Sequence, residues 1–169
     1  MRLRLALCAA PLLAGIYFGW TLAASARRRR ELIAAHISAL EFIKAEISSR
    51  LTPLPECAAR LAAGGPRPLR GFYLALAAAL DAPCGRDFAS IWGSLLENME
   101  LPPDALAVLA ELGRSLGRYD AQTQREAIER AGAGLERILA SLRERDASLD
   151  RLRVGLSAAA GALAALILY

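Results

Sequence analysis

The chain has 169 residues and a formal net charge of +4, a length that suits a single domain. Its 21 basic and 17 acidic residues are interspersed, and this near balance excludes the dense positive surface of a nucleic-acid-binding protein. The 3 cysteines, Cys8, Cys57 and Cys84, are far apart and odd in number, which argues against a disulfide framework or a cysteine metal site and indicates a reducing compartment.

Charged side chains are confined to the middle of the chain. Residues 5–26 and 154–169 contain none, whereas residues 27–153 carry all the acidic residues. A helix needs roughly 20 apolar residues to cross a bilayer, which the first segment provides and the second approaches. We therefore expect a transmembrane helix over residues 1–26, a helical domain over residues 27–153 and a second transmembrane helix over residues 154–169.

Arginines flank both apolar segments on the side of the central domain. Because positive flanks are retained in the cytoplasm, they predict a cytoplasmic central domain on the cell membrane. Two alternatives stay open: residues 1–26 also have the layout of a cleavable signal peptide, and residues 154–169 also suit the buried last helix of a soluble protein. The membrane-flanking basic residues are Arg27, Arg28, Arg29, Arg30, Arg151 and Arg153.

Behind the first arginines, apolar residues recur at helical spacing and nothing breaks a helix before position 50. We expect the first membrane helix to continue through residues 27–50 as one rod. Thr52 is expected to cap a second helix, which has Pro53 in its first turn and ends at Gly64-Gly65. The apolar stripe of the rod consists of Ile33, Ile37, Leu40 and Ile47, with Lys44 beside them.

Three short helices follow. The third begins at Pro66, the fourth is capped near Asp87, and Pro102-Pro103 opens the fifth. Each has apolar residues at helical spacing that are expected to face a common core. These residues are Leu69, Phe72, Tyr73, Leu76 and Leu80, then Phe88, Ile91, Trp92 and Leu95, then Leu106, Leu109, Leu112 and Leu116.

The last helix is predicted to be the longest, because no proline follows Pro103. Ile128, Leu135, Leu142 and Leu149 repeat every seven residues, and such a heptad seam requires a partner helix. Two long rods with short helices between them predict an all-α antiparallel bundle of about six helices.

Motifs for catalysis are missing from the sequence, which has no phosphate-binding glycine loop and no nucleophile elbow. His36 is the single histidine and is expected to be a hydrogen-bonded or exposed structural residue. The pairs Glu97 with Glu100 and Glu126 with Glu129 predict a solvated, ion-paired face. We expect a non-enzymatic protein without a cofactor, a metal or a small-molecule substrate.

The segment from Leu112 to Gln124, which joins the fifth and sixth helices, is the most specific pattern in the chain. Gly113 costs a helix about 1 kcal/mol relative to alanine, so another helix is expected to approach it closely. Gly117 is placed to end the fifth helix in the left-handed conformation, and Asp120 to cap the sixth through the Thr123 amide.

We call this segment the corner, and two interpretations of it stay open: a tightly built turn or a surface that docks a partner. Gln122 and Gln124 are expected to form hydrogen bonds across it. Its candidate site residues are Leu112, Gly113, Leu116, Gly117, Tyr119, Asp120 and Gln124.

The corner occurs together with Leu40-Glu41, Glu46-Ile47, Thr52-Pro53-Leu54 and the two apolar ends. With these motifs the chain resembles the stage III sporulation protein AB family. The resemblance implies a membrane component of the channel complex between mother cell and forespore. It also implies a helical domain similar to the cytoplasmic domains of type II secretion and type IV pilus platform proteins. The implied partners are an ATPase like stage III sporulation protein AA, other membrane subunits and the lipid bilayer.

Three functions remain open from the sequence. The first is a non-enzymatic component that couples a secretion-type ATPase to a sporulation channel in the mother-cell membrane facing the forespore. The second is a platform subunit of a secretion or pilus machine outside sporulation. The third is a small membrane-anchored regulator that binds a soluble partner through its heptad seam.

Overall fold

The computed structural model describes the backbone of residues 2–50, 52–82, 85–117 and 120–168, and side chains between positions 21 and 148 apart from 22, 49 and 50. These residues form six α-helices and one short 3₁₀ turn, without a strand, so the predicted all-α class is confirmed. The elements are α1 (Arg2–Arg50), α2 (Leu54–Gly64), η1 (Arg67–Leu69), α3 (Arg70–Asp81), α4 (Phe88–Leu96), α5 (Pro103–Ser115) and α6 (Ala121–Leu168).

The predicted transmembrane segments, residues 1–26 and 154–169, fall mostly on positions whose side chains lie outside the described residues. Within the described part of the chain, no helix is both long enough and apolar enough to cross a membrane. The backbone of α1 and α6 nevertheless continues without a break through most of both segments, as the sequence predicts.

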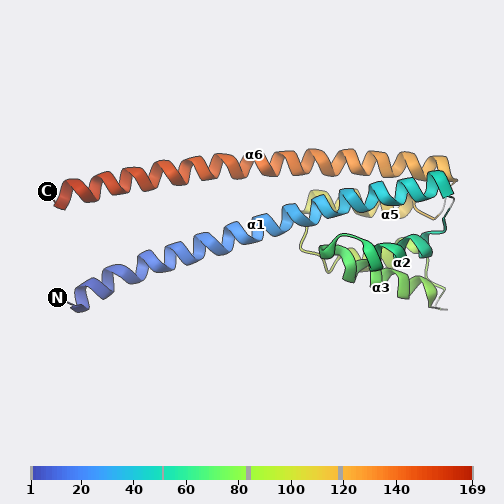
Figure 1. Cartoon of the computed structure of the whole chain (residues 1–169), viewed down its shortest axis with the longest axis horizontal. Helices are drawn as coiled ribbons and strands as arrows, with labels where there is room; N and C mark the ends of the chain where they lie inside the picture. Colours follow the sequence, from blue (N-terminus) through green and yellow to red (C-terminus); the bar gives the residue numbers. More distant parts are fainter. Residues whose placement is uncertain (1, 51, 83–84, 118–119, 169) are drawn as a thin grey trace.

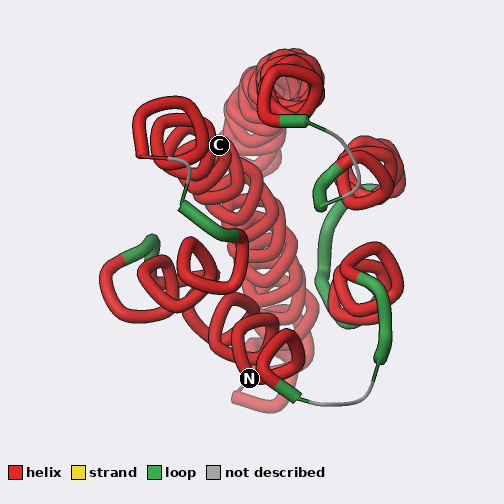
Figure 2. The backbone as a smooth tube through the Cα atoms, turned by 90° about the vertical axis from the view of Figure 1, so that its right-hand side faces the viewer, coloured by secondary structure: helices red, strands yellow, loops and turns green. Residues whose placement is uncertain are grey.

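The two long helices run antiparallel and pack against each other, so that both chain termini lie at the same end (Figure 1). Helices α2 to α5 lie against the half of α1 and α6 that is farther from the termini, and together they form the bundle. Viewed along its length, the bundle surrounds a common interior (Figure 2). We call the end near Asp120 the distal end and the opposite end, where α1 and α6 leave the bundle, the proximal end.

The heptad seam of α6 is buried inside the bundle. Ile128, Ala131, Leu135 and Leu139 are buried, and Leu142 is partly buried. The partner that the heptad pattern requires is therefore supplied by α1 and α5, which both pack on α6. This corrects the third sequence-based hypothesis, because the described seam is not available to a soluble partner.

Trp92 lies at the centre of the packing among α3, α4 and α5. Its side chain is fully buried, and its Nε1 donates a hydrogen bond of 2.8 Å to the carbonyl oxygen of Leu109. Phe72 meets the indole edge-on at 5.1 Å between ring centroids, and Phe88 stacks on it at 5.6 Å. Burial of a paired indole with ordered aromatic neighbours fixes how these three helices meet.

Most of the predicted helix boundaries are confirmed. Helix α2 ends at Gly64, and the amide of Gly65 donates to the Leu61 carbonyl oxygen at 2.8 Å. Asp87 caps α4 by accepting a hydrogen bond of 3.3 Å from the Ser90 amide. Glycine fits the end of α2 because a Cβ on Gly65 would overlap the Leu61 carbonyl oxygen, and Asp87 fits the start of α4 because its side chain accepts from an amide of the first turn.

Two predictions about single side chains are wrong. Thr52 does not cap α2: Pro53 takes the cap position, and the buried Thr52 hydroxyl donates to Glu46 Oε2 at 2.9 Å. His36 is neither exposed nor hydrogen-bonded among the described residues, since its ring is fully buried and neither nitrogen has a partner. It meets Phe72 edge-on at 5.8 Å between centroids. Both side chains respond to tertiary neighbours that the local sequence does not contain.

Candidate functional site

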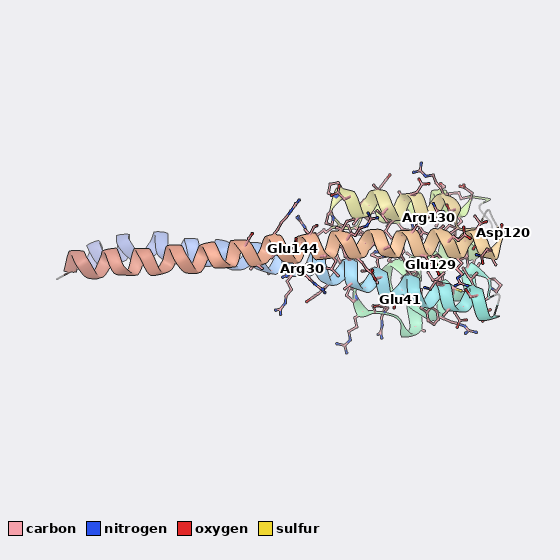
Figure 3. All side chains as sticks on the ribbon, turned by 90° about the horizontal axis from the view of Figure 1, so that it is seen from above. Arg30, Glu41, Asp120, Glu129, Arg130 and Glu144 are labelled. Carbon is pink, nitrogen blue, oxygen red and sulfur yellow. The ribbon has the colours of Figure 1, made fainter. Side chains whose placement is uncertain are left out.

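The corner closes the distal end of the bundle (Figure 3). The amide of Leu116 donates to the Leu112 carbonyl oxygen at 3.0 Å, which completes the last turn of α5. Gly117 then takes a φ of +79°, the left-handed conformation that the sequence predicts. The chain can turn sharply there because glycine has no Cβ to strain this backbone.

Asp120 caps α6 with three hydrogen bonds. Its Oδ1 accepts from the amides of Gln122 at 3.0 Å and Thr123 at 3.1 Å, and its Oδ2 accepts from the Thr123 hydroxyl at 2.8 Å. The hydrogen bonds from the Thr123 amide and hydroxyl hold the pKa of Asp120 below its usual value. The predicted cap is confirmed. Gln122 corrects another expectation, because its amide group donates along α6 to Glu126 Oε1 at 2.9 Å and not across the corner.

Gly113 is a point at which α5 lies close to α4. A Cβ built on Gly113 would overlap the five-membered ring of Trp92, so only glycine fits beneath the indole. The close approach expected from the sequence is confirmed, and α4 is the helix that makes it.

The corner residues divide into an internal and an external group. Leu112, Gly113 and Leu116 are buried and belong to the core, whereas Gly117 and Asp120 are exposed. Gln124 is half-buried at the surface, and Tyr119 lies outside the described residues. A partner can therefore reach only the external group.

The external part of the corner lies against the connection between α1 and α2. Together they form a cavity of about 370 Å³ at the distal end, which we call the distal groove. The groove joins two motifs that are about 60 residues apart in the chain, and no spacing in the sequence predicts that they meet. Its lining consists of Ile47, Thr52, Pro53, Leu54, Pro55, Gly117, Ala121 and Gln124.

A polar cluster supports one wall of the distal groove. Glu46, with 8% of its surface exposed, accepts hydrogen bonds from Thr52 Oγ1 at 2.9 Å and Arg60 Nη1 at 3.0 Å. The Cys57 thiol donates to the Thr52 carbonyl oxygen, with 3.7 Å between sulfur and oxygen. Burial, followed by the charge of Glu46, raises the pKa of Cys57 to about 11, so this sulfur remains a protonated thiol and is a poor nucleophile. The cluster holds residues 52–55 in place.

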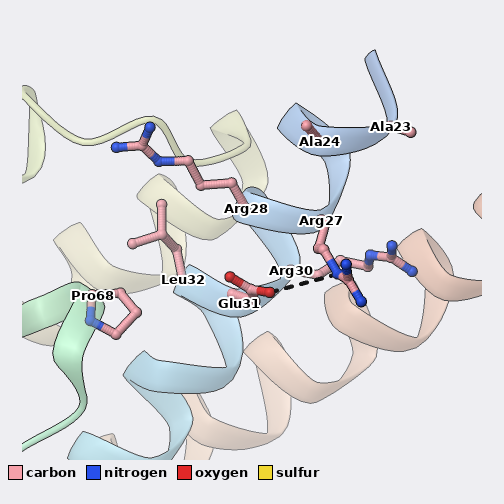
Figure 4. Close-up of a pocket in the computed structure, with 8 residues that line it drawn as sticks. All are labelled: Ala23, Ala24, Arg27, Arg28, Arg30, Glu31, Leu32 and Pro68. Atoms are coloured by element: carbon pink, nitrogen blue, oxygen red, sulfur yellow. Dashed lines mark ion pairs between the residues drawn. The ribbon is translucent and has the colours of Figure 1, made fainter. Parts of the chain in front are cut away.

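Arg30 lies at the proximal end of the bundle (Figure 3), and Arg27 and Arg28 lie beside it on α1 (Figure 4). Arg30 Nε lies 3.2 Å from Asp146 Oδ2 and ties α1 to α6. Arg28 lies 4.0 Å from Glu100, in the connection between α4 and α5. The side chains of Arg151 and Arg153 lie outside the described residues.

Glu129 on α6 is ion-paired and solvated. Glu129 lies 3.7 Å from Lys44 Nζ and 3.2 Å from Arg125 Nε, with 44% of its side chain exposed. This confirms the expectation for Glu129, whereas Glu126 accepts a hydrogen bond from the neutral side-chain amide of Gln122. Across the described residues, no three His, Cys, Asp or Glu side chains are grouped so that they could hold a metal ion.

The fold and site define an all-α bundle protein in which a capped corner joins α5 to α6. Beyond that class, the chain belongs to the stage III sporulation protein AB family, whose sequence pattern matches residues 4–169. It is therefore a member of a sporulation protein family, and that family is not one of enzymes. The resemblance noted from the sequence motifs is confirmed.

A solved structure supports the same fold. The structure described as stage III sporulation protein AB (SpoIIIAB) aligns with a TM-score of 0.64 and 24% sequence identity, over 72% of this chain and 98% of that one. At this identity the likeness shows a shared fold. None of the curated protein sequences compared with the chain matches it significantly.

Proposed function

We propose that the protein is a non-enzymatic membrane component of a sporulation channel complex between mother cell and forespore. In this role it couples a cytoplasmic secretion-type ATPase, like stage III sporulation protein AA, to the other membrane subunits. Membership of the sporulation family supports the setting. The uncharged residues 5–26 and 154–169 support attachment to the mother-cell membrane at both ends of the chain.

The observation that carries this proposal is the continuity of the two long helices. Helix α1 runs from Arg2 to Arg50 and α6 from Ala121 to Leu168, and each joins an apolar end to the packed bundle without a break. Every turn of an α-helix is held by backbone hydrogen bonds, so a displacement of the bundle moves the attached segment with it. Because α1 and α6 pack on each other, both segments would move together.

The distal groove is the surface that we assign to the ATPase. It lies at the end of the bundle opposite the apolar segments, where a large soluble partner is not obstructed by the bilayer. Its walls are held by the Asp120 cap on one side and the Glu46 cluster on the other, so the groove is formed before a partner arrives. Preformed surfaces bind with a smaller entropic cost.

Co-purification of the full chain with the ATPase from membranes tests both statements. Ala121 is exposed and lines the groove, so Ala121→Arg should fill it and abolish co-purification. Ala140 is exposed on the same helix and does not line the groove, so Ala140→Arg is the matched control and should leave the contact intact. No contact in the unmodified chain, with both proteins present, would exclude the coupling role. If Ala121→Arg still co-purifies with the ATPase, the contact lies outside the distal groove.

A further inference from the structure

The proximal end contains a pocket of about 650 Å³ beside α1. Arg27, Arg28 and Arg30 line it, and we call it the arginine pocket (Figure 4). Its other lining residues are mainly apolar and come from α1 and η1: Ala23, Ala24, Leu32 and Pro68. Guanidinium groups and an apolar wall thus lie within one cavity.

The arginines reach the cavity from different sides. Arg28 extends over Leu32 and toward Pro68, whereas Arg27 and Arg30 extend to the other side of α1, toward α6 (Figure 4). A second cavity of about 340 Å³ shares Arg28, Leu32 and Pro68 and continues between α3 and α4. The apolar surface therefore extends beyond the arginines and is long enough to accept more than a small ion.

Two of the three arginines are held only weakly by protein carboxylates. Arg27 lies 3.8 Å from Glu31, and Arg28 lies 4.0 Å from Glu100; both side chains are more than 70% exposed. Exposed ion pairs of this kind contribute about 0–1 kcal/mol, so a phosphate can replace these carboxylates at little cost. A guanidinium binds phosphate through two parallel hydrogen bonds, which a surface carboxylate at these distances does not match.

The charge near the pocket favours an anion. Its lining contains three arginines and one acidic residue, Glu31. Glu100 and Asp146 face the rim from the connection after α4 and from α6. Arg29 and Arg67, both exposed, are the sequence neighbours of lining residues and add positive charge.

We propose that the arginine pocket binds the headgroup of an anionic phospholipid, with the phosphate on Arg28, the glycerol and acyl portions along the apolar wall, and Arg27 adding positive charge from the other side of α1. The position follows from the proposed function, because the pocket begins at Ala23, inside the uncharged residues 5–26 that would cross the bilayer. Clusters of arginine directly next to a membrane segment attract anionic lipid by about 1 kcal/mol per residue. Inorganic phosphate would gain nothing from the apolar wall.

The test measures the thermal unfolding midpoint of the full chain in neutral detergent micelles, with short-chain phosphatidylglycerol, short-chain phosphatidylcholine or inorganic phosphate added. Phosphatidylglycerol should raise the midpoint in a saturable way, because a ligand that binds the folded state stabilises it. The other two compounds should not do so at the same concentrations. In Arg27→Gln/Arg28→Gln the apparent affinity for phosphatidylglycerol should fall by about fivefold for each arginine.

Arg125→Gln/Arg130→Gln is the matched control, since it removes the same charge from exposed positions on α6 outside the pocket. Each variant is compared with its own lipid-free midpoint, so a lower starting stability does not obscure the affinity. An equal shift with phosphatidylcholine or with phosphate, or an equal loss in the control, would overturn the lipid site.

Alkaline extraction of membranes containing the full chain separates this proposal from the proposed function. If the chain is extracted, the membrane role fails, while the detergent titration still reports on the pocket. If the chain stays in the membrane and shows no preference for phosphatidylglycerol, only the lipid site fails.

Discussion

Phe72 separates two buried ring contacts that differ in their hydrogen bonding. On one side it meets Trp92 at 5.1 Å, and the indole nitrogen is paired with the Leu109 carbonyl oxygen. On the other side it meets His36 at 5.8 Å, and both imidazole nitrogens lack a partner among the described residues. Tyr73, at 5.2 Å from Phe72, is also buried, and its hydroxyl has no hydrogen-bond partner in the part of the chain that the structure describes.

This difference shows where the stability of the bundle is sensitive to geometry and where it is sensitive to protons. Around Trp92 the indole nitrogen is hydrogen-bonded and the side chains are closely packed, so added atoms should destabilise this region. The side of His36 and Tyr73 carries buried polar atoms without partners, each of which costs about 1–3 kcal/mol. That side should weaken with acid and gain from the removal of polar atoms.

The largest expected effect is acid destabilisation through His36. Burial lowers its pKa from 6.5 to about 4, so between these values the unfolded chain binds a proton that the folded chain does not. The free energy of unfolding therefore has its full value, as far as His36 is concerned, above about pH 6.5. It falls by about 3 kcal/mol in total as the pH decreases toward 4. Denaturant unfolding of the full chain in micelles, followed by circular dichroism from pH 7 to pH 4, measures this slope.

His36→Leu is the variant that isolates the histidine, because leucine has a similar volume and no polar atom. It should flatten the slope between pH 4 and 6.5 and raise stability at pH 7 by about 1 kcal/mol. Asp120 contributes to the acid loss only near the lower end of this window, because hydrogen bonds from Thr123 lower its pKa in the folded chain. An unchanged slope in His36→Leu would show that another group causes the acid loss.

Gly113→Ala tests the packing around Trp92. The added methyl would overlap the indole and displace a fully buried ring, which we expect to reduce the free energy of unfolding by about 2 kcal/mol. Gly132→Ala is the matched control within α6, where a Cβ meets no other atom within 4 Å. It should stabilise the helix by about 0.5–1 kcal/mol. Equal effects of the two substitutions would show that the indole can move aside freely.

The sequence predicts much of the packing around Trp92 and little of the packing around His36 and Tyr73. Gly113 suggested a close approach because glycine is unfavourable inside a helix, and the structure supplies Trp92 as the reason. Asp120, Gly117 and the prolines mark helix ends because capping and turning depend on residues within a few positions. Local chemistry of this kind can be recognised without knowing which helices meet.

The errors concern side chains whose partners are distant in the chain or missing. Thr52 stands where a helix cap is expected from the sequence, yet its hydroxyl donates a hydrogen bond to Glu46 of the preceding helix. His36 is buried and meets Phe72 of α3, and no pattern around position 36 reveals that. The distal groove and the arginine pocket likewise arise where separate elements meet, at Gly117 with Leu54 and at Arg28 with Pro68.

Gly117→Val extends the comparison from the Trp92 side to the corner. A Cβ on Gly117 would lie 3.5 Å from the Cβ of Phe88, which is ordinary van der Waals contact, so space is available. The cost should come from the backbone, since valine strongly disfavours a φ of +79°, and we expect a loss of about 1–2 kcal/mol. Gly117→Asn tolerates this conformation better and should lose less. Equal losses in the thermal unfolding of both variants would point to crowding against Phe88.

The smallest expected effect comes from Tyr73→Phe, which removes only the unpaired hydroxyl and keeps the ring against Phe72. Burial raises the pKa of Tyr73 further above its usual value of 10, so no phenolate forms at neutral pH and the neutral hydroxyl alone is at issue. Its removal should increase the free energy of unfolding by up to about 1 kcal/mol, because the desolvation cost disappears and no hydrogen bond is lost. The gain should be independent of pH between 4 and 7, unlike that of His36→Leu. A loss of stability would mean that the hydroxyl has a partner in solution, such as a buried water, and that the two sides of Phe72 differ less than their protein contacts indicate.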